Sequence, residues 1–149
     1  MNKGASPSVR GALFDRLVDT DPGTLNIAPS QKTMTVGELK ESVRTEIAWL
    51  LNTRCPTQIT EKGDTDRHFY NYGIPDFSCF FPDSNANRKR LAQTIQNSIT
   101  AYEPRLKNVA VSVDDFMNRE DKFSLQITIK AYLIINKVRE PVTFVMNVG

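Results

Sequence analysis

The feature that most constrains the fold is a change in hydrophobic period after Arg105. Downstream of this residue, apolar side chains recur at every second position in three runs separated by turn-forming residues. The runs are Val109, Val111 and Val113; alternate residues from Phe123 to Ile135; and Val142, Phe144, Met146 and Val148. Such alternation indicates strands with one buried face. Turns at Asn118–Asp121 and Asn136–Pro141 then predict a three-stranded antiparallel meander.

Upstream of Arg105 the period is that of an α-helix. Thr35 and Glu38 have the spacing of a capping box, so they predict a helix start. The apolar stripe that follows comprises Val36, Leu39, Val43, Ile47 and Leu50. Cys55-Pro56 is expected to end this helix, because proline lacks the backbone donor and restricts the residue before it.

A second helix is predicted over Asn85–Tyr102, with Pro104 stopping it. Its buried face is expected to carry Leu91, Ile95, Ile99 and Tyr102. Helices and strands that are segregated along the chain indicate the α+β class. The expected architecture is two helices packed on the three-stranded antiparallel sheet, in a single domain over residues 35–149.

Residues 1–34 form a polar N-terminal arm that proline and glycine interrupt. Ser8–Val18 has the pattern of one short amphipathic helix, and its apolar face includes Leu13, Phe14 and Leu17. A helix this short is marginal in water when isolated. It therefore packs on its own domain or contacts a partner, and both possibilities stay open at this stage.

A stretch over about residues 56–84 is rich in turn formers and holds most of the aromatic side chains. The rings are Phe69, Tyr70, Tyr72, Phe77, Phe80 and Phe81. They are compatible with a nucleotide-stacking surface or a ligand pocket, but also with a long loop anchored on the core by its rings. We favour the anchored loop, because nothing else in the stretch indicates a ligand.

Composition excludes several functional classes for the 149-residue chain. A net charge of +2 argues against a nucleic-acid surface, and no apolar run approaches the ~20 residues of a membrane helix. Two cysteines and one histidine make a metal site improbable, and no cofactor motif is present. The N-terminus lacks the apolar stretch of a signal peptide, so we expect a cytoplasmic protein.

No catalytic constellation emerges from the sequence. A thiol nucleophile would have to pair Cys55 or Cys79 with His68, and neither spacing indicates an activated cysteine. A glycosidase needs two carboxylates, one of them in an apolar pocket, and the candidates Glu46, Glu61 and Glu103 carry no such signature. The chain is therefore predicted not to be an enzyme.

The last apolar run has an unusual absence of charge. No charged residue or proline occurs over Val142–Val148, whereas natural edge strands are usually blunted by one or the other. If this strand lies at the edge of the sheet, Val142, Thr143, Phe144, Val145 and Met146 form a segment open to strand addition by another chain. If the strand is central, the segment is ordinary core.

Glu103-Pro104-Arg105 follows the second helix and precedes the first strand. In one interpretation Pro104 only ends the helix, while Glu103 and Arg105 pair in water for ~0–1 kcal/mol. In the other, a rigid corner presents Arg105 and Glu103 to a partner, since the planar guanidinium suits bidentate recognition.

The tripeptide and its context resemble the baseplate wedge family of contractile phage tails. Ser42-Val43-Arg44 through Asn52-Thr53-Arg54 is similar to the family's first helix, and Tyr72-Gly73-Ile74-Pro75-Asp76 to the loop after it. Leu13-Phe14-Asp15-Arg16-Leu17, within a long arm, is similar to the TssE branch from type VI secretion systems. The resemblance covers about residues 9–148.

The resemblance implies a structural role in a secretion baseplate. In that family the wedge protein grips a helical core bundle of TssF and TssG through its Glu-Pro-Arg corner, which here is Glu103, Pro104 and Arg105. It also implies an assembly with TssK, sheath subunits TssB and TssC that polymerise from the wedge, and a cytoplasmic baseplate docked at the inner membrane complex. The family is also called lysozyme-like, so a peptidoglycan-cleaving enzyme is the competing function. A third possibility is an interaction module of another complex.

Overall fold

The structure is a computed structural model that describes residues 9–10, 33–55, 71–76, 85–114, 125–136 and 138–148. The chain divides into two compact units, residues 1–45 and 46–149, and the boundary falls within a helix. The boundary predicted from the sequence between residues 34 and 35 stays a prediction.

In the first unit, β1 (Val9–Arg10) pairs antiparallel with β2 (Thr33–Met34). The predicted helix over Ser8–Val18 is therefore wrong at Val9 and Arg10, which are extended because the backbone of β2 supplies a partner. The remainder of that prediction, including Leu13, Phe14 and Leu17, lies outside the described residues.

Helix α2 (Val36–Asn52) begins at the predicted capping box. The Thr35 N–H donates to Glu38 Oε2 at 2.7 Å, and the Glu38 N–H donates to Thr35 Oγ1 at 3.3 Å. These two bonds satisfy donors that a helix start otherwise leaves unpaired. The predicted apolar stripe of α2 is buried at Leu39, Val43, Ile47 and Leu50.

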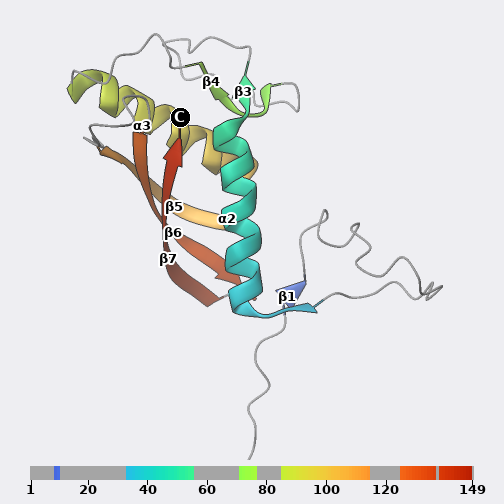
Figure 1. Ribbon diagram of the computed structural model, residues 1–149. Helices are drawn as coiled ribbons and strands as arrows, with labels where there is room; N and C mark the ends of the chain where they lie inside the picture. Colours follow the sequence, from blue (N-terminus) through green and yellow to red (C-terminus); the bar gives the residue numbers. More distant parts are fainter. Residues whose placement is uncertain are drawn as a thin grey trace, which may run out of the picture. The chain divides into compact units, whose positions relative to one another are not determined.

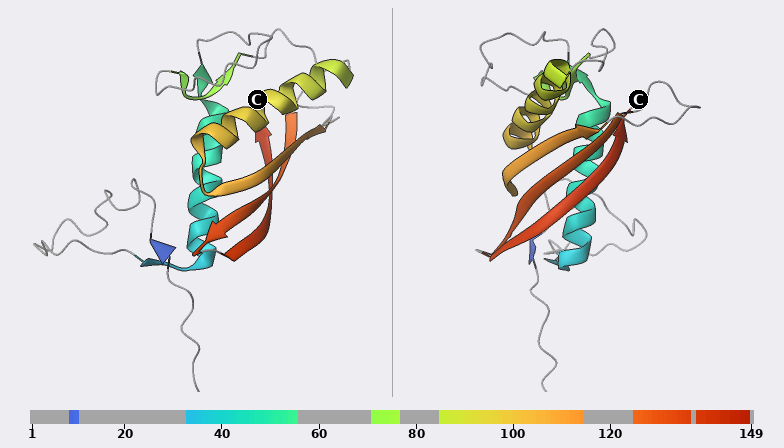
Figure 2. Two further views of the ribbon diagram at one scale, coloured as in Figure 1. Left: turned by 180° about the vertical axis from the view of Figure 1, so that it is seen from behind. Right: turned by 90° about the vertical axis from the view of Figure 1, so that its left-hand side faces the viewer.

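The second unit contains a three-stranded antiparallel sheet in the order β5–β6–β7 (Figure 1). The strands are β5 (Leu106–Asp114), β6 (Leu125–Ile135) and β7 (Val138–Val148). Helix α3 (Asn85–Tyr102) contacts β5, on one side of the sheet (Figure 2). The predicted α+β class, with two helices and this antiparallel sheet, is confirmed.

Alternation along the strands separates a buried face from an exposed one. Leu106 opposite Leu133, and Ile129 opposite Phe144, are buried pairs on the inner face. In α3, Ile95, Ile99 and Ser98 are fully buried and Thr94 is nearly so. Tyr102 is only half-buried. The apolar contacts between helix and sheet form the core of this unit.

The turn before β7 is shorter than predicted. Residues 136 and 137 alone connect Ile135 to its partner Val138, so the expected turn over Asn136–Pro141 is wrong from Val138 onward. Asn136 has φ 44°, the left-handed conformation that tight two-residue hairpins need.

A minor pair of strands follows α2. β3 (Arg54–Cys55) runs parallel to β4 (Ile74–Pro75). The strand β4 lies within the stretch that was predicted to be a loop, and β3 occupies residues at the predicted helix end, Cys55-Pro56, because α2 already ends at Asn52. The Ile74 N–H donates to the Thr53 carbonyl at 3.0 Å, and Ile74 is fully buried. This anchors one point of the aromatic stretch on the core; Phe69, Tyr70, Phe77, Phe80 and Phe81 lie outside the described residues.

Candidate functional site

The Glu103-Pro104-Arg105 corner joins α3 to β5 and is held by backbone hydrogen bonds on both sides. The Glu103 N–H donates to the Ile99 carbonyl at 2.8 Å, which continues the helix by one bond. The Leu106 N–H donates to the Glu103 carbonyl at 3.2 Å, and the Ile134 N–H of β6 donates to the Arg105 carbonyl at 2.9 Å. The corner therefore has a single backbone geometry fixed by its neighbours.

Glu103 and Arg105 form a bidentate ion pair at this corner. Arg105 Nε donates to Glu103 Oε1 at 2.7 Å and Nη2 donates to Oε2 at 2.6 Å, while the Arg105 backbone N–H also donates to Oε1 at 3.2 Å. The Glu103 side chain is only 4% exposed and that of Arg105 is 20% exposed. The interpretation that the two residues pair is confirmed, but its assumption that they pair in water is wrong, because the carboxylate is buried and its charge is balanced by the guanidinium fork.

Glu46 of α2 completes the cluster. Arg105 Nη2 donates to Glu46 Oε2 at 2.6 Å, across 59 positions of sequence. The guanidinium of Arg105 thus bridges two carboxylates from different parts of the chain. It connects Glu46 of α2 with the corner between α3 and β5. Sequence reasoning considered Glu46 only as a possible catalytic acid, because no periodicity or motif links it to Arg105.

Tyr72 lies beside these charges. Its ring meets the Tyr102 ring edge-on, with centroids 5.2 Å apart and an interplanar angle of 69°. Burial raises the pKa of the Tyr72 hydroxyl, and the negative charges of Glu46 and Glu103, with Tyr102, raise it further.

This geometry does not suit glycoside hydrolysis. The reaction needs one carboxylic acid with a raised pKa in an apolar pocket and a second carboxylate that reaches the sugar. Both oxygens of Glu103 are occupied by Arg105, and the side chain is almost completely buried. Glu46 accepts from the same nitrogen, so the two carboxylates serve one structural arginine.

The second candidate surface is the edge of β7. Among the described residues, β7 pairs with β6 on one side and with no strand on the other, so it is an edge strand. Thr143 and Val145 are exposed, while Val142 and Phe144 are buried, as the alternation predicted. Val142, Thr143, Phe144, Val145 and Met146 therefore lie on an edge strand of the sheet, and their role as a contact stays a prediction.

Pro141 reveals which main-chain groups of β7 point outward. Proline has no N–H, so at this position opposite Tyr132 it gives no ladder bond to β6. Antiparallel ladders alternate between hydrogen-bonded and non-hydrogen-bonded pairs. The groups of Thr143 and Val145, at even spacing from Pro141, accordingly point away from β6 and toward the open edge.

The two halves of β7 differ in protection. Arg139, Glu140 and Pro141 supply the charge and proline that natural edges use against unwanted pairing, whereas Val142–Val148 contains neither. At the opposite edge, β5 has a bulge between Lys107 and Ala110, where Asn108 has φ 51°. A bulge disrupts pairing and twists the strand, so β5 is the better-protected edge.

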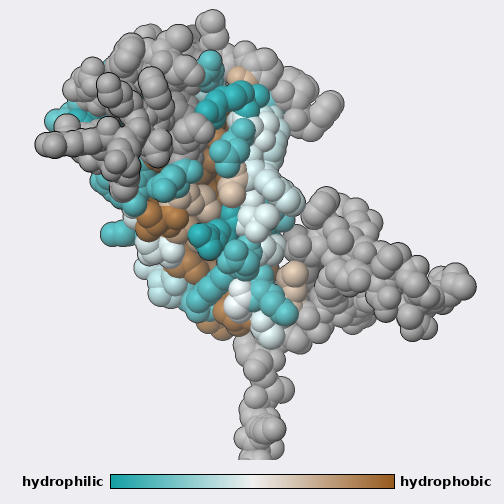
Figure 3. All heavy atoms as spheres, in the orientation of Figure 1, coloured by the Kyte–Doolittle hydropathy of each residue, from teal (hydrophilic) through white to brown (hydrophobic). Residues whose placement is uncertain are grey.

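Within the parts of the chain that are described, no cluster of three or more metal-ligating side chains occurs, and no helix is long and apolar enough to cross a membrane. Apolar side chains do reach the surface over the sheet, interleaved with hydrophilic ones (Figure 3). The large exposed apolar residues are Trp49 of α2, Tyr132 of β6, and Val138 and Val145 of β7.

An open strand edge is a surface to which another chain can add a strand, as in modules that assemble with other proteins. The family model described as "Baseplate wedge protein gp25" matches residues 37–138. The chain belongs to this baseplate wedge family, and the resemblance drawn from the sequence is confirmed.

A solved structure entitled "The baseplate complex from the type VI secretion system" contains a chain of the same fold. The TM-score is 0.54 with 17% sequence identity, over 76% of this chain and 96% of that chain. No curated protein sequence matches the chain.

Proposed function

We propose that the chain is a TssE-type wedge subunit of a type VI secretion baseplate, where it seeds polymerisation of the contractile sheath. Membership in the baseplate wedge family supports a structural role. The fold shared with a chain of a type VI secretion baseplate complex supports the choice of secretion system. The baseplate would be docked on the cytoplasmic side of an inner membrane complex.

The observation that carries the sheath role is the unprotected half of the β7 edge. Thr143 and Val145 direct main-chain groups away from β6, and no charge or proline interrupts Val142–Val148. A sheath strand from TssB or TssC would continue the sheet by hydrogen bonding to these groups. Side chains at alternate positions would then set the register.

The test is a Thr143→Pro variant, with Thr143→Ala as the matched control. The proline removes one outward donor and leaves the ladder between β6 and β7 intact, whereas alanine keeps the N–H. We expect Thr143→Pro to fold and bind the other wedge proteins but to support no sheath tubes by electron microscopy. Normal tubes with the proline variant would refute the sheath role of β7.

We propose that the corner formed by Glu103, Pro104 and Arg105 docks, through its exposed Pro104, on a core bundle of TssF and TssG in an assembly that includes TssK. Pro104 is exposed, and the ion pair behind it holds the corner rigid. Rigid surfaces lose little conformational entropy on binding. A Pro104→Ala variant should pull down less TssF and TssG than the wild type, with an unchanged thermal melt; equal recovery would remove the corner from the interface.

We also propose that Leu13, Phe14 and Leu17 of the arm contact a partner, and that the chain has no catalytic activity. The pairing of both Glu46 and Glu103 with Arg105 argues against a muramidase. Purified protein incubated with peptidoglycan should release no more reducing ends than buffer. Release that is lost in a Glu46→Gln variant would instead identify an enzyme.

A further inference from the structure

The exposed face of the sheet carries a cluster of positive charge around one aromatic ring. Because Leu106 is buried opposite Leu133, Lys107 and its partner Tyr132 belong to the other, exposed face. Tyr132 also lies opposite Pro141 of β7. The tyrosine is 42% exposed, a large fraction for a ring in the middle strand of a sheet.

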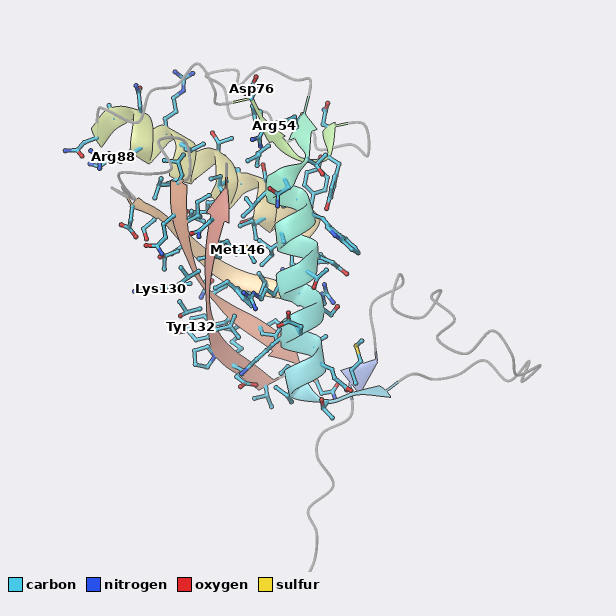
Figure 4. The ribbon with its side chains drawn as sticks, viewed as in Figure 1. Arg54, Asp76, Arg88, Lys130, Tyr132 and Met146 are labelled. Atoms are coloured by element: carbon cyan, nitrogen blue, oxygen red, sulfur yellow. The ribbon has the colours of Figure 1, made fainter. Side chains whose placement is uncertain are left out.

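Two further cations surround Tyr132. Lys130 precedes it by two positions on β6, and Figure 4 shows the two side chains projecting from the same side of the sheet. Arg139 lies opposite Ile134 and is therefore diagonal to Tyr132. We call Lys107, Lys130, Tyr132, Arg139 and Pro141 the Tyr132 patch.

The charges of the Tyr132 patch are not balanced within the described structure. Lys107, Lys130 and Arg139 are exposed and form no ion pair with any described carboxylate. The acidic residue on this face of the three strands is Asp114, at the other end of β5, where Thr128 Oγ1 donates to it at 3.5 Å. Glu140 alternates onto the inner face, opposite Leu133.

Like charges gathered on one face repel each other, and a partner of opposite charge relieves that repulsion. Three cations are few for a nucleic-acid surface, since affinity there grows with the number of phosphates neutralised. An exposed tyrosine with charged residues around it is instead typical of a protein interface, where aromatic residues are enriched at the centre and the rim is polar.

We propose that the Tyr132 patch binds an acidic polypeptide segment of a partner protein. Carboxylates of the segment would pair with Lys107, Lys130 and Arg139, and its main chain or an apolar side chain would cover the Tyr132 ring. This surface is distinct from the corner and from the open edge of β7. The inference therefore stands independently of the proposed sheath contact.

The experiment measures binding of fluorescein-labelled poly-L-glutamate to the full chain at physiological ionic strength, by fluorescence anisotropy. We expect a Lys130→Glu/Arg139→Glu variant to bind at least about tenfold more weakly, because charge attraction becomes repulsion. The control reverses two exposed charges of α3, Lys89→Glu combined with Arg90→Glu, and its binding should stay within about twofold because charge interactions at long range are screened.

Backbone amide shifts of the isotope-labelled protein locate the contact. Perturbations should centre on Lys107, Lys130, Tyr132 and Arg139, and Tyr132→Ala should weaken binding without altering the thermal melt. Absence of binding, equal weakening in the control, or shifts centred elsewhere would overturn the proposal. Tighter binding of a DNA duplex or of phosphatidylserine vesicles through the same residues would also overturn it, in favour of a different polyanion.

Discussion

The guanidinium of Arg105 spans both carboxylate oxygens of Glu103, through Nε at 2.7 Å and Nη2 at 2.6 Å, at a corner where Glu103 is almost completely buried. Burying a carboxylate is unfavourable unless a cation and hydrogen bonds compensate it. Removal of one member of the pair should therefore lower the stability of the fold, because the other charge stays buried without compensation.

Arg105→Ala should destabilise the fold by about 3 kcal/mol, because it leaves Glu103 buried without its cation and Glu46 without its link. Urea unfolding at neutral pH measures the difference. The matched control is Arg44→Ala, which removes a pair with Glu41 at 3.7 Å between side chains 55% and 68% exposed. Arg44→Ala should lower the free energy of unfolding by at most about 0.5 kcal/mol. Equal stability of the two variants would contradict the structural role of Arg105.

Gly73→Ala should destabilise the chain by about 2 kcal/mol or more, because a left-handed φ and a steric conflict act together. Gly73 has φ 113°, and an added Cβ would lie 2.4 Å from the Thr53 carbonyl oxygen, which accepts the Ile74 N–H. Gly37→Ala is the control, since its nearest neighbour would be Thr35 Oγ1 at 4.0 Å. There we expect a gain of up to about 1 kcal/mol. Thermal melts of both variants give the comparison.

Local patterns predicted the helices and strands because each depends on a period that neighbouring residues share. Thr35 and Glu38 form the expected capping box, and α3 has the predicted limits. The alternating runs became β5, β6 and β7. The start of β7 was missed because Arg139, Glu140 and Pro141 look like a turn, yet on an edge strand their polar groups reach solvent.

The candidate site was less predictable, because it depends on contacts between residues far apart in sequence. Arg105 and Glu103 were singled out together, but Glu46 joins them across 59 positions through the tertiary fold. The edge position of β7 depends on strand order, which alternation does not encode. The sequence analysis did not single out Tyr132, because its proximity to three cations depends on the strand register.

Asn108 offers a test of the bulge in β5. Its φ of 51° is left-handed, a conformation that asparagine tolerates and that costs other L residues about 1–2 kcal/mol. Asn108→Val should destabilise by about that amount, whereas Asn108→Gly should be nearly neutral. Chemical denaturation distinguishes the two. A valine variant as stable as the glycine variant would mean that the strand pairs without the bulge.

The hydroxyl of Tyr72 should make stability depend on pH in the alkaline range. Its pKa is raised above the ordinary 10.0, first by burial and then by the charges of Glu46 and Glu103. At pH values between the pKa of this hydroxyl in the unfolded state and its higher pKa in the folded state, the native state binds more protons than the unfolded state. The free energy of unfolding therefore falls as pH rises through that range. Below pH 10.0 the contribution of the protonated Tyr72 hydroxyl to stability is fully present.

Tyr72→Phe should therefore lose less stability than the wild type as pH rises above 10.0, measured by urea unfolding at a series of pH values. Absorbance titration supplies a second readout, because Tyr72→Phe should remove a phenol of raised pKa from the curve. Glu46→Gln should lower the pKa of the remaining Tyr72 hydroxyl, since one of the charges that raise it is gone. Glu41→Gln, which removes an exposed carboxylate of α2, is the charge-matched control and should leave that hydroxyl unchanged. If stability falls in parallel with pH for the wild type and Tyr72→Phe, folding does not raise the pKa of the Tyr72 hydroxyl and the prediction is wrong.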